Sequence, residues 1–198
     1  MSMLSNTKAI LGVAFLNLSF VSLVQSAPAD PQAGQTKAQM CSGCHGAAGI
    51  SSIPGVPHLA AQPSLSIVYQ LIQFKSQARV GGGMEGIAAS LSDQDMKDIG
   101  AYYFSLAPNK GVQADPNKIA QGQKIAAQQF CQSCHAGQLQ GQKHVPRIAG
   151  QAPDYLKVQL KKLRSGERAD MDGTMASAAK NLTDEEIEAI VAYAQSLN

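Results

Sequence analysis

The sequence predicts an all-α protein that contains two copies of one small domain. The chain repeats itself, because the segment that begins at Cys41 recurs in altered form 90 residues later, at Cys131. Apolar residues near the end of each copy recur at positions i, i+3, i+7 and i+10, which is the spacing of one helix face. No segment shows the alternation of apolar and polar residues that is typical of a strand.

The repeat starts at the only four cysteines of the chain, in Cys41-Ser42-Gly43-Cys44-His45 and Cys131-Gln132-Ser133-Cys134-His135. It continues through residues 57–62 and 146–151, which share a proline, an alanine and a glutamine at matching positions. We therefore predict an N-terminal domain at 27–108 and a C-terminal domain at 109–198. The linker falls at about 107–116, where proline, glycine and asparagine interrupt helical patterns.

The first 26 residues have the pattern of a secretory signal. Lys8 precedes a short apolar run that ends at Val24, which is shorter than the ~20 apolar residues of a membrane-spanning helix. We predict a signal peptide at 1–26, cleaved between residues 26 and 29, with an uncleaved anchor as the alternative. Export places the rest of the chain outside the cytoplasm.

Each copy contains three predicted helices. The leading helices begin at Asp30-Pro31 and Asp115-Pro116, where an N-cap precedes a proline, and the first of them is the shorter. In the second copy the apolar stripe is Ile119, Gly122, Ala126 and Phe130. Middle helices follow at about 64–77 and 154–165. The last helices begin at two capping boxes, Ser92-x-x-Asp95 and Thr183-x-x-Glu186.

The repeated C-x-x-C-H motif is the pattern for covalent attachment of haem c. Its two thiols bond to the haem and its histidine binds the iron. Four cysteines also permit two short disulfides, a thioredoxin-type redox pair or half a zinc site. We favour haem because a histidine follows both times and no cysteine is left over. The motifs predict two haem c groups, attached at Cys41, Cys44, Cys131 and Cys134, with His45 and His135 on the irons.

The second axial ligand of each iron is predicted to be methionine. Met84 follows His45 by 39 residues and Met175 follows His135 by 40, and both lie in loops that contain glycine. The competing candidates are Met40, Met96, Met171 and His144. Met96 lies on a helix stripe and is predicted to be in the core. Residue 58 is a histidine where the second copy has Arg147, which favours a surface role or contact with a haem carboxylate over ligation.

Composition indicates a chain that depends on the haem for its core. There is no tryptophan and aromatic residues are 5% of the sequence, so a domain of this size buries little apolar surface. We expect the haem-free protein to be largely unfolded. The net charge of +2 argues against nucleic-acid binding. One basic run, Lys157 to Arg164, fits a solvated helix face better than a docking patch.

The chain resembles the dihaem cytochrome c4 family in four repeated features. They are the tandem C-x-x-C-H motifs, the Pro-x-Leu/Ile-x-x-Gln segments, the arginine before each methionine loop and the closing Leu-Ser/Thr-Asp helices. The resemblance implies two class I cytochrome c domains, packed with pseudo-twofold symmetry, that relay electrons in the periplasm. It also implies that a backbone carbonyl near Pro57 and Pro146 holds each histidine N–H. The first copy departs from the family pattern with Ser66, where the second has Tyr155, so we expect the two haem potentials to differ.

These features predict an electron carrier rather than an enzyme. Histidine and methionine together close the iron to substrates, and methionine raises its potential. We expect redox partner proteins and no small-molecule substrate, with transfer from a quinol-oxidising complex to a terminal oxidase or reductase. The alternative is an electron-transfer subunit of a flavoprotein such as sulfide dehydrogenase, and a peroxidase or thiosulfate-oxidising enzyme is disfavoured. Peripheral membrane association stays open.

Overall fold

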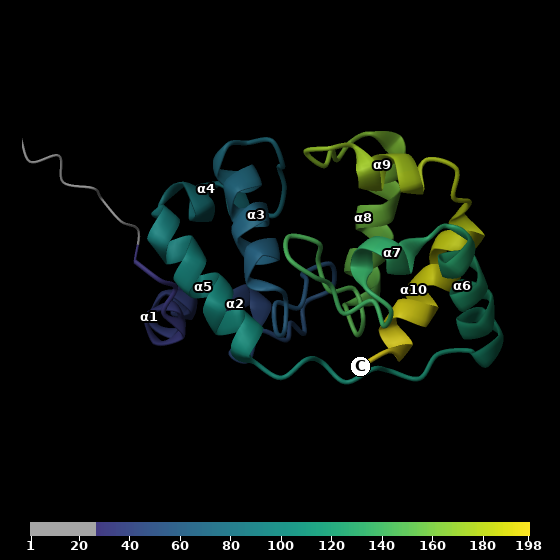
Figure 1. Ribbon diagram of the computed structural model, residues 1–198, viewed down its shortest axis with the longest axis horizontal. Coiled ribbons are helices and arrows are strands. Elements are labelled where there is room, and N and C mark those ends of the chain that lie inside the picture. Colours follow the sequence, from purple (N-terminus) through teal and green to yellow (C-terminus); the bar gives the residue numbers. More distant parts are fainter. Residues whose placement is uncertain (1–26) are drawn as a thin grey trace, which may run out of the picture.

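A computed structural model of the chain describes residues 27–198, so the predicted signal peptide lies outside the described residues. Two helical halves lie side by side and an extended segment joins them (Figure 1). Within residues 27–198 there is no strand, only an isolated bridge between Gln142 and Val145, and the all-α prediction is confirmed. No helix in this range is long and apolar enough to cross a bilayer.

The first half contains five α-helices and one 3₁₀ turn: α1 (Pro31–Lys37), η1 (Ala38–Cys41), α2 (Ser42–His45), α3 (Ser64–Lys75), α4 (Met84–Ala89) and α5 (Asp93–Ser105). The second half contains five: α6 (Pro116–Gln128), α7 (Cys131–His135), α8 (Pro153–Ser165), α9 (Thr174–Ala179) and α10 (Asp184–Ser196). We propose the domain boundary within 107–116, where no helix forms between α5 and α6 (Figure 1).

The helix starts follow their predicted capping residues. The side chains of Asp30 and Asp115 accept N–H bonds at the starts of α1 and α6. Both capping boxes are complete. The side chains of Ser92 and Thr183 accept the main-chain N–H three residues on, and the acidic side chain at that position accepts the main-chain N–H of Ser92 or Thr183. As predicted, the first leading helix is short, because α1 gives way to a 3₁₀ turn before the cysteines.

Each half has its own apolar core, formed where the leading helix and the middle helix pack on the last helix. In the stripe predicted on α5, Met96, Ile99 and Tyr103 are buried, while Leu106 lies just past the helix and is partly buried. Met96 is 1% exposed, which confirms its place in the core. On α10 the matching residues Ile187, Ile190 and Ala194 are buried as well. The cores hold the short helices that carry the cysteine motifs.

The stripe predicted on α6 is wrong at its last position. Helix α6 ends at Gln128, and Phe130 adopts a left-handed backbone conformation with φ of 55°. Its side chain is therefore turned out of the stripe and is 73% exposed. Ile125 fills the inner face instead and is 7% exposed. The chain changes direction at Phe130, just before α7 begins. The apolar stripe of α6 therefore ends at Ala126, one turn earlier than the sequence suggests.

The halves meet through hydrogen bonds that occur in pairs with the roles exchanged. Gln62 donates to the carbonyl of Arg147 (2.8 Å) and accepts from its N–H (3.0 Å). Gln151 likewise donates to the carbonyl of His58 (2.9 Å) and accepts from its N–H (2.7 Å). Both glutamines are buried. Such reciprocal contacts are those of a pseudo-twofold interface between two similar halves.

Candidate functional site

The two cysteine motifs occupy equivalent places, at the end of a leading helix and beside the last helix of each half. No disulfide joins any of the four cysteines within residues 27–198, and no group of three or more candidate ligands that would bind a metal ion occurs there. Burial raises the pKa of Cys41 and of Cys131. A raised thiol pKa disfavours the reactive thiolate of a redox pair. The disulfide, zinc and redox-pair alternatives therefore lack structural support.

Each motif histidine is buried and oriented by one backbone carbonyl. The Nδ1 of His45 lies 3.0 Å from the Pro57 oxygen, and that of His135 lies 2.8 Å from the Pro146 oxygen. Because a carbonyl only accepts, Nδ1 carries the proton and Nε2 keeps its lone pair. Burial lowers the pKa of both histidines, so the neutral imidazole is favoured. The Nε2 atom of His135 is buried without a hydrogen-bond partner, as a metal-binding nitrogen would be.

The two predicted methionines lie at the starts of matching short helices and not in the loops that the sequence suggests. Met84 follows Gly83 and starts α4, and Met175 is the second residue of α9, which follows Gly173. Both glycines have positive φ, near 74° and 71°, which L side chains rarely adopt. Both methionines line the cavity that also contains the motif histidines.

The competing ligands are placed less favourably. Met171 is 68% exposed and does not line the cavity, while Met40 borders the cavity but is 51% exposed and precedes the first cysteine directly. His144 lies against Tyr69, with ring centroids 5.5 Å apart. His58 accepts a hydrogen bond at Nδ1 from the N–H of Ser51 (3.0 Å). These positions favour Met84 and Met175 among the alternatives that the sequence left open.

One large cavity of about 1130 Å³ runs between the halves and contains both motifs and both methionines. Typical pockets for one small molecule have about 300–1,000 Å³. Apolar side chains from the middle and last helices of both halves line it, including Leu71, Phe74, Ile99, Leu163 and Ile190. Its size and lining fit flat apolar groups bound in both halves.

Three arginines line this cavity without carboxylate partners. Arg79 and Arg147 are buried, and none of the ion pairs within residues 27–198 includes them or Arg168. The Nη2 of Arg147 and the Nε of Arg168 are buried without any partner. Buried cations are normally paired with anions. The carboxylates of a haem supply such anions, so the residues present fit the group that the motifs predict.

A polar cluster joins the halves beside the arginines. Arg79 of the first half donates to Gln70, to the hydroxyl of Tyr155 (2.9 Å) and to Gln159 (3.2 Å). Arg168 of the second half donates to Gln159 (2.7 Å) and to Gln70 (3.2 Å). Each arginine thus binds glutamines of both middle helices. The sequence showed these residues only as parts of a repeat, without indicating that they meet.

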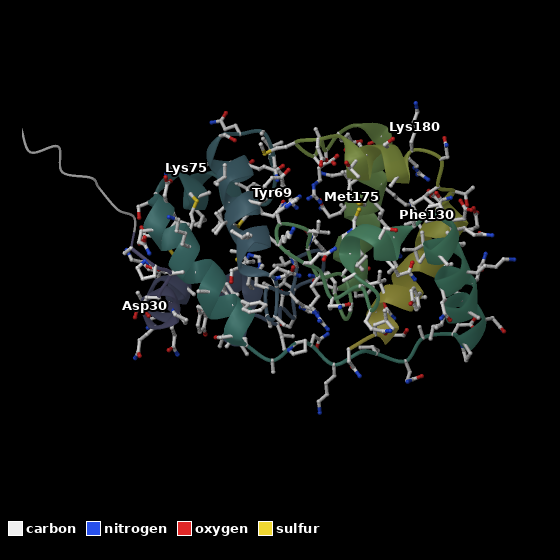
Figure 2. All side chains as sticks on the ribbon, viewed as in Figure 1. Asp30, Tyr69, Lys75, Phe130, Met175 and Lys180 are labelled. Atoms are coloured by element: carbon white, nitrogen blue, oxygen red, sulfur yellow. The ribbon has the colours of Figure 1, made fainter. Side chains whose placement is uncertain are left out.

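Tyr69 was not predicted to take part in the site. It lies on α3 between the halves (Figure 2). Its hydroxyl accepts a 3.3 Å hydrogen bond from the N–H of Met171, and its ring contacts His144, so it touches two loops of the second half. The matching residue in the repeat is Val158, which has no hydroxyl. The interface is therefore asymmetric at this point.

The basic run on α8 is largely neutralised within its own half. Lys157 pairs with Glu188 at 2.8 Å. Lys161 and Arg164 both pair with Asp184, at 2.7 Å each. Both carboxylates belong to α10, so these ion pairs join α8 to the last helix. The pairing supports the predicted solvated face over a docking patch.

The chain is similar to known c-type cytochromes. A family model described as cytochrome c matches residues 119–198. The chain is 37% identical to cytochrome c4 of Pseudomonas aeruginosa, over 92% of this chain and 96% of that one. It is 31% identical to a thiosulfate dehydrogenase electron acceptor of Stutzerimonas stutzeri, over 93% and 92%. The crystal structure of reduced recombinant cytochrome c4 from Pseudomonas stutzeri superimposes with a TM-score of 0.80 at 33% identity, covering 86% of this chain and 100% of that one.

Proposed function

Since this chain belongs to the cytochrome c4 family, we propose that it relays electrons between redox proteins of the bacterial periplasm. It carries two haem c groups, and each supplies an iron that takes up and releases one electron. The observation that supports the relay role is that both halves place a buried, neutral histidine and a methionine on one shared cavity. Two such ligands leave an iron no position for a substrate.

We assign the residues that hold the haems on the basis of this arrangement. Covalent attachment is assigned to Cys41 and Cys44 in the first half, and to Cys131 and Cys134 in the second. His45 and Met84 are the axial pair of the first iron. In the second half the pair is His135 and Met175. These assignments rest on the matched positions of the two motifs and of the two methionine helices.

The protein limits reorganisation around each site. The carbonyls of Pro57 and Pro146 fix the planes of the histidine rings. Asp170 holds the start of α9, since its carboxylate accepts the N–H groups of Met175 (2.7 Å) and Ala176 (3.1 Å). Mainly apolar side chains line the shared cavity, so few polar groups have to reorient when the charge of the site changes. A site that changes little between charge states suits rapid electron transfer.

Two kinds of electron donor remain. The first is a quinol-oxidising complex, from which electrons pass to a terminal oxidase or reductase. The second is a thiosulfate dehydrogenase, which is favoured by the similarity to an electron acceptor of such an enzyme. In either case the chain is the carrier and not the catalyst, and no finding favours the flavoprotein alternative.

A visible spectrum and redox titration of the purified holoprotein test the proposal. We expect two haems per chain, the methionine–iron absorption band in the oxidised form, two resolved potentials and no binding of carbon monoxide to the reduced form. Rapid mixing with each donor then identifies the one that reduces the haems fastest. Carbon monoxide binding, or a single haem per chain, would exclude a closed two-haem relay.

A further inference from the structure

One peptide unit links the first histidine to the opposite half of the molecule. The carbonyl of the Pro57–His58 peptide accepts the Nδ1–H of His45 at 3.0 Å. The N–H of the same peptide donates to Oε1 of Gln151, in the second half, at 2.7 Å. Gln151 is 5% exposed, and its own amide group donates back to the His58 carbonyl at 2.9 Å. The peptide is therefore hydrogen-bonded at both ends.

The second histidine has the same arrangement with the halves exchanged. The carbonyl of the Pro146–Arg147 peptide accepts the Nδ1–H of His135 at 2.8 Å. Its N–H donates to Oε1 of Gln62, in the first half, at 3.0 Å. Gln62 is 6% exposed and its amide nitrogen donates to the Arg147 carbonyl at 2.8 Å. Each glutamine thus bonds the peptide that orients the histidine of the other half.

Hydrogen bonds in such a chain strengthen one another. When a peptide N–H donates, electron density shifts onto its carbonyl oxygen, which becomes a better acceptor, and this polarisation is largest in a low-dielectric interior. A stronger acceptor at Nδ1 makes Nε2 of the imidazole a more basic ligand. A more electron-donating ligand stabilises the oxidised iron relative to the reduced iron. The expected result is a lower reduction potential for the haem iron that this histidine binds.

We propose that Gln62 and Gln151 are positioning residues that tune the haem potentials crosswise. Gln62 of the first half lowers the potential of the second haem, and Gln151 of the second half lowers that of the first. The inference rests on the proposed ligation of iron by His45 and His135. In this proposal the interface between the halves helps to set the haem potentials, because separation of the halves would break both hydrogen bonds and raise both potentials.

The test replaces Gln62 by methionine in the full holoprotein, a change of similar volume that removes the amide group. In Gln62→Met the potential of the second haem rises and that of the first is unchanged. The Nδ1–H proton resonance of His135 in the reduced protein moves upfield, since its hydrogen bond weakens. Gln151→Met gives the reverse pattern, with the effect on the first haem and on His45. Met175→Ala identifies which titration step belongs to the second haem.

General loosening of the interface gives a different result. Loosening would move both haem potentials together in either variant, and that result overturns the inference. A shift confined to the haem of the half that carries the substitution overturns it as well. If Gln62→Met does not yield folded holoprotein, Gln62→Asn replaces it, because its amide is one methylene too short to reach the peptide. An intact histidine–methionine spectrum with an unmoved second potential overturns this inference alone. Absence of that spectrum in the unsubstituted protein overturns the proposed function too.

Discussion

Helix α6 crosses helix α10 with Gly122 pressed against the main chain of Ala189. A methyl group on Gly122 would lie 1.9 Å from the Ala189 carbonyl oxygen, which no side-chain rotation can relieve. Gly34 meets Asp98 in the same way in the first half, where the equivalent distance is also 1.9 Å. The crossing of leading and last helices therefore requires glycine in both halves.

Gly122→Ala is expected to lower the free energy of unfolding by about 3 kcal/mol, at the upper end for overpacking, because the helices must separate. Denaturant unfolding of the holoprotein measures the change. The matched control is Gly86→Ala in α4, where an added methyl group meets nothing within 4 Å. The control should be neutral or slightly stabilising. Equal effects of the two substitutions would contradict the close crossing.

Local signals in the sequence account for most of the fold within each half. The capping boxes at Ser92 and Thr183 form as predicted because they need only residues three positions apart. The proline after Asp115 likewise places the start of α6. The end of α6 was less predictable, because the left-handed conformation of Phe130 is imposed by the following turn and not by its own residue type. Helix periodicity alone extended the stripe too far.

The contacts between the halves could not be predicted from the sequence. Gln62 and Gln151 stood out only as repeated residues, and the repeat does not say which partner each one has. Their hydrogen bonds join residues 85 and 93 positions apart, respectively. Such contacts depend on how two finished halves dock. The one signal in the sequence is that a glutamine recurs at the matching position of both copies.

Two neighbouring methionines compete as the second ligand of the second iron, Met171 in the loop before α9 and Met175 in α9. Met175 lines the cavity, while Met171 is 68% exposed. Met175→Ala should remove the methionine–iron band of one haem, lower its potential and open its iron to carbon monoxide, since a ligand is lost. Met171→Ala is the matched control and should leave the spectrum and both potentials unchanged. The opposite pattern would assign the ligand to Met171.

The polar cluster between the halves contributes to stability through Tyr155. Tyr155→Phe keeps the ring and removes the hydroxyl that accepts a hydrogen bond from Arg79 at 2.9 Å. We expect a loss of about 1.5–3 kcal/mol in the free energy of unfolding, because the bond involves a charged donor. Urea titration of the holoprotein measures it. The control is Tyr102→Phe, which removes a hydroxyl that makes no hydrogen bond within residues 27–198 and should lower the free energy of unfolding far less. Similar losses in the two variants would rule out a special role for Tyr155.

Acid should weaken the first capping box. Hydrogen bonding to Ser92 and the contact with Lys37 hold the pKa of Asp95 at about 2, below its ordinary 3.8. A lowered folded-state pKa stabilises the protein above the ordinary value, and this contribution is lost as the pH falls from 3.8 toward 2. Because the carboxylate is exposed, solvent screening keeps the effect small, about 0.5 kcal/mol.

The measurement compares Asp95→Asn with the unsubstituted holoprotein in urea at several pH values. Asp95→Asn should be the less stable protein at pH near 6, and the difference should shrink as the carboxylate of the reference protein becomes protonated. Lys37→Met removes the 2.9 Å ion pair with Asp95 but leaves the capping box intact. Its loss of stability at pH near 6 should therefore be smaller than that of Asp95→Asn. A difference that stays constant down to pH 2.5 would contradict the linkage.

Removal of the haems should unfold the chain, because the cavity of about 1130 Å³ borders the apolar cores of both halves and would be left unfilled. Apolar side chains that line it, such as Val80 (63% exposed) and Phe130 (73% exposed), would stay in contact with water. The separate cores are small and contain no tryptophan, so little remains to offset the conformational entropy of folding. Protein expressed without the attachment machinery should have little helical circular dichroism and a broad thermal transition, while the holoprotein melts cooperatively. A sharp, cooperative melt of the haem-free chain with native helix content would mean that the apolar clusters suffice on their own.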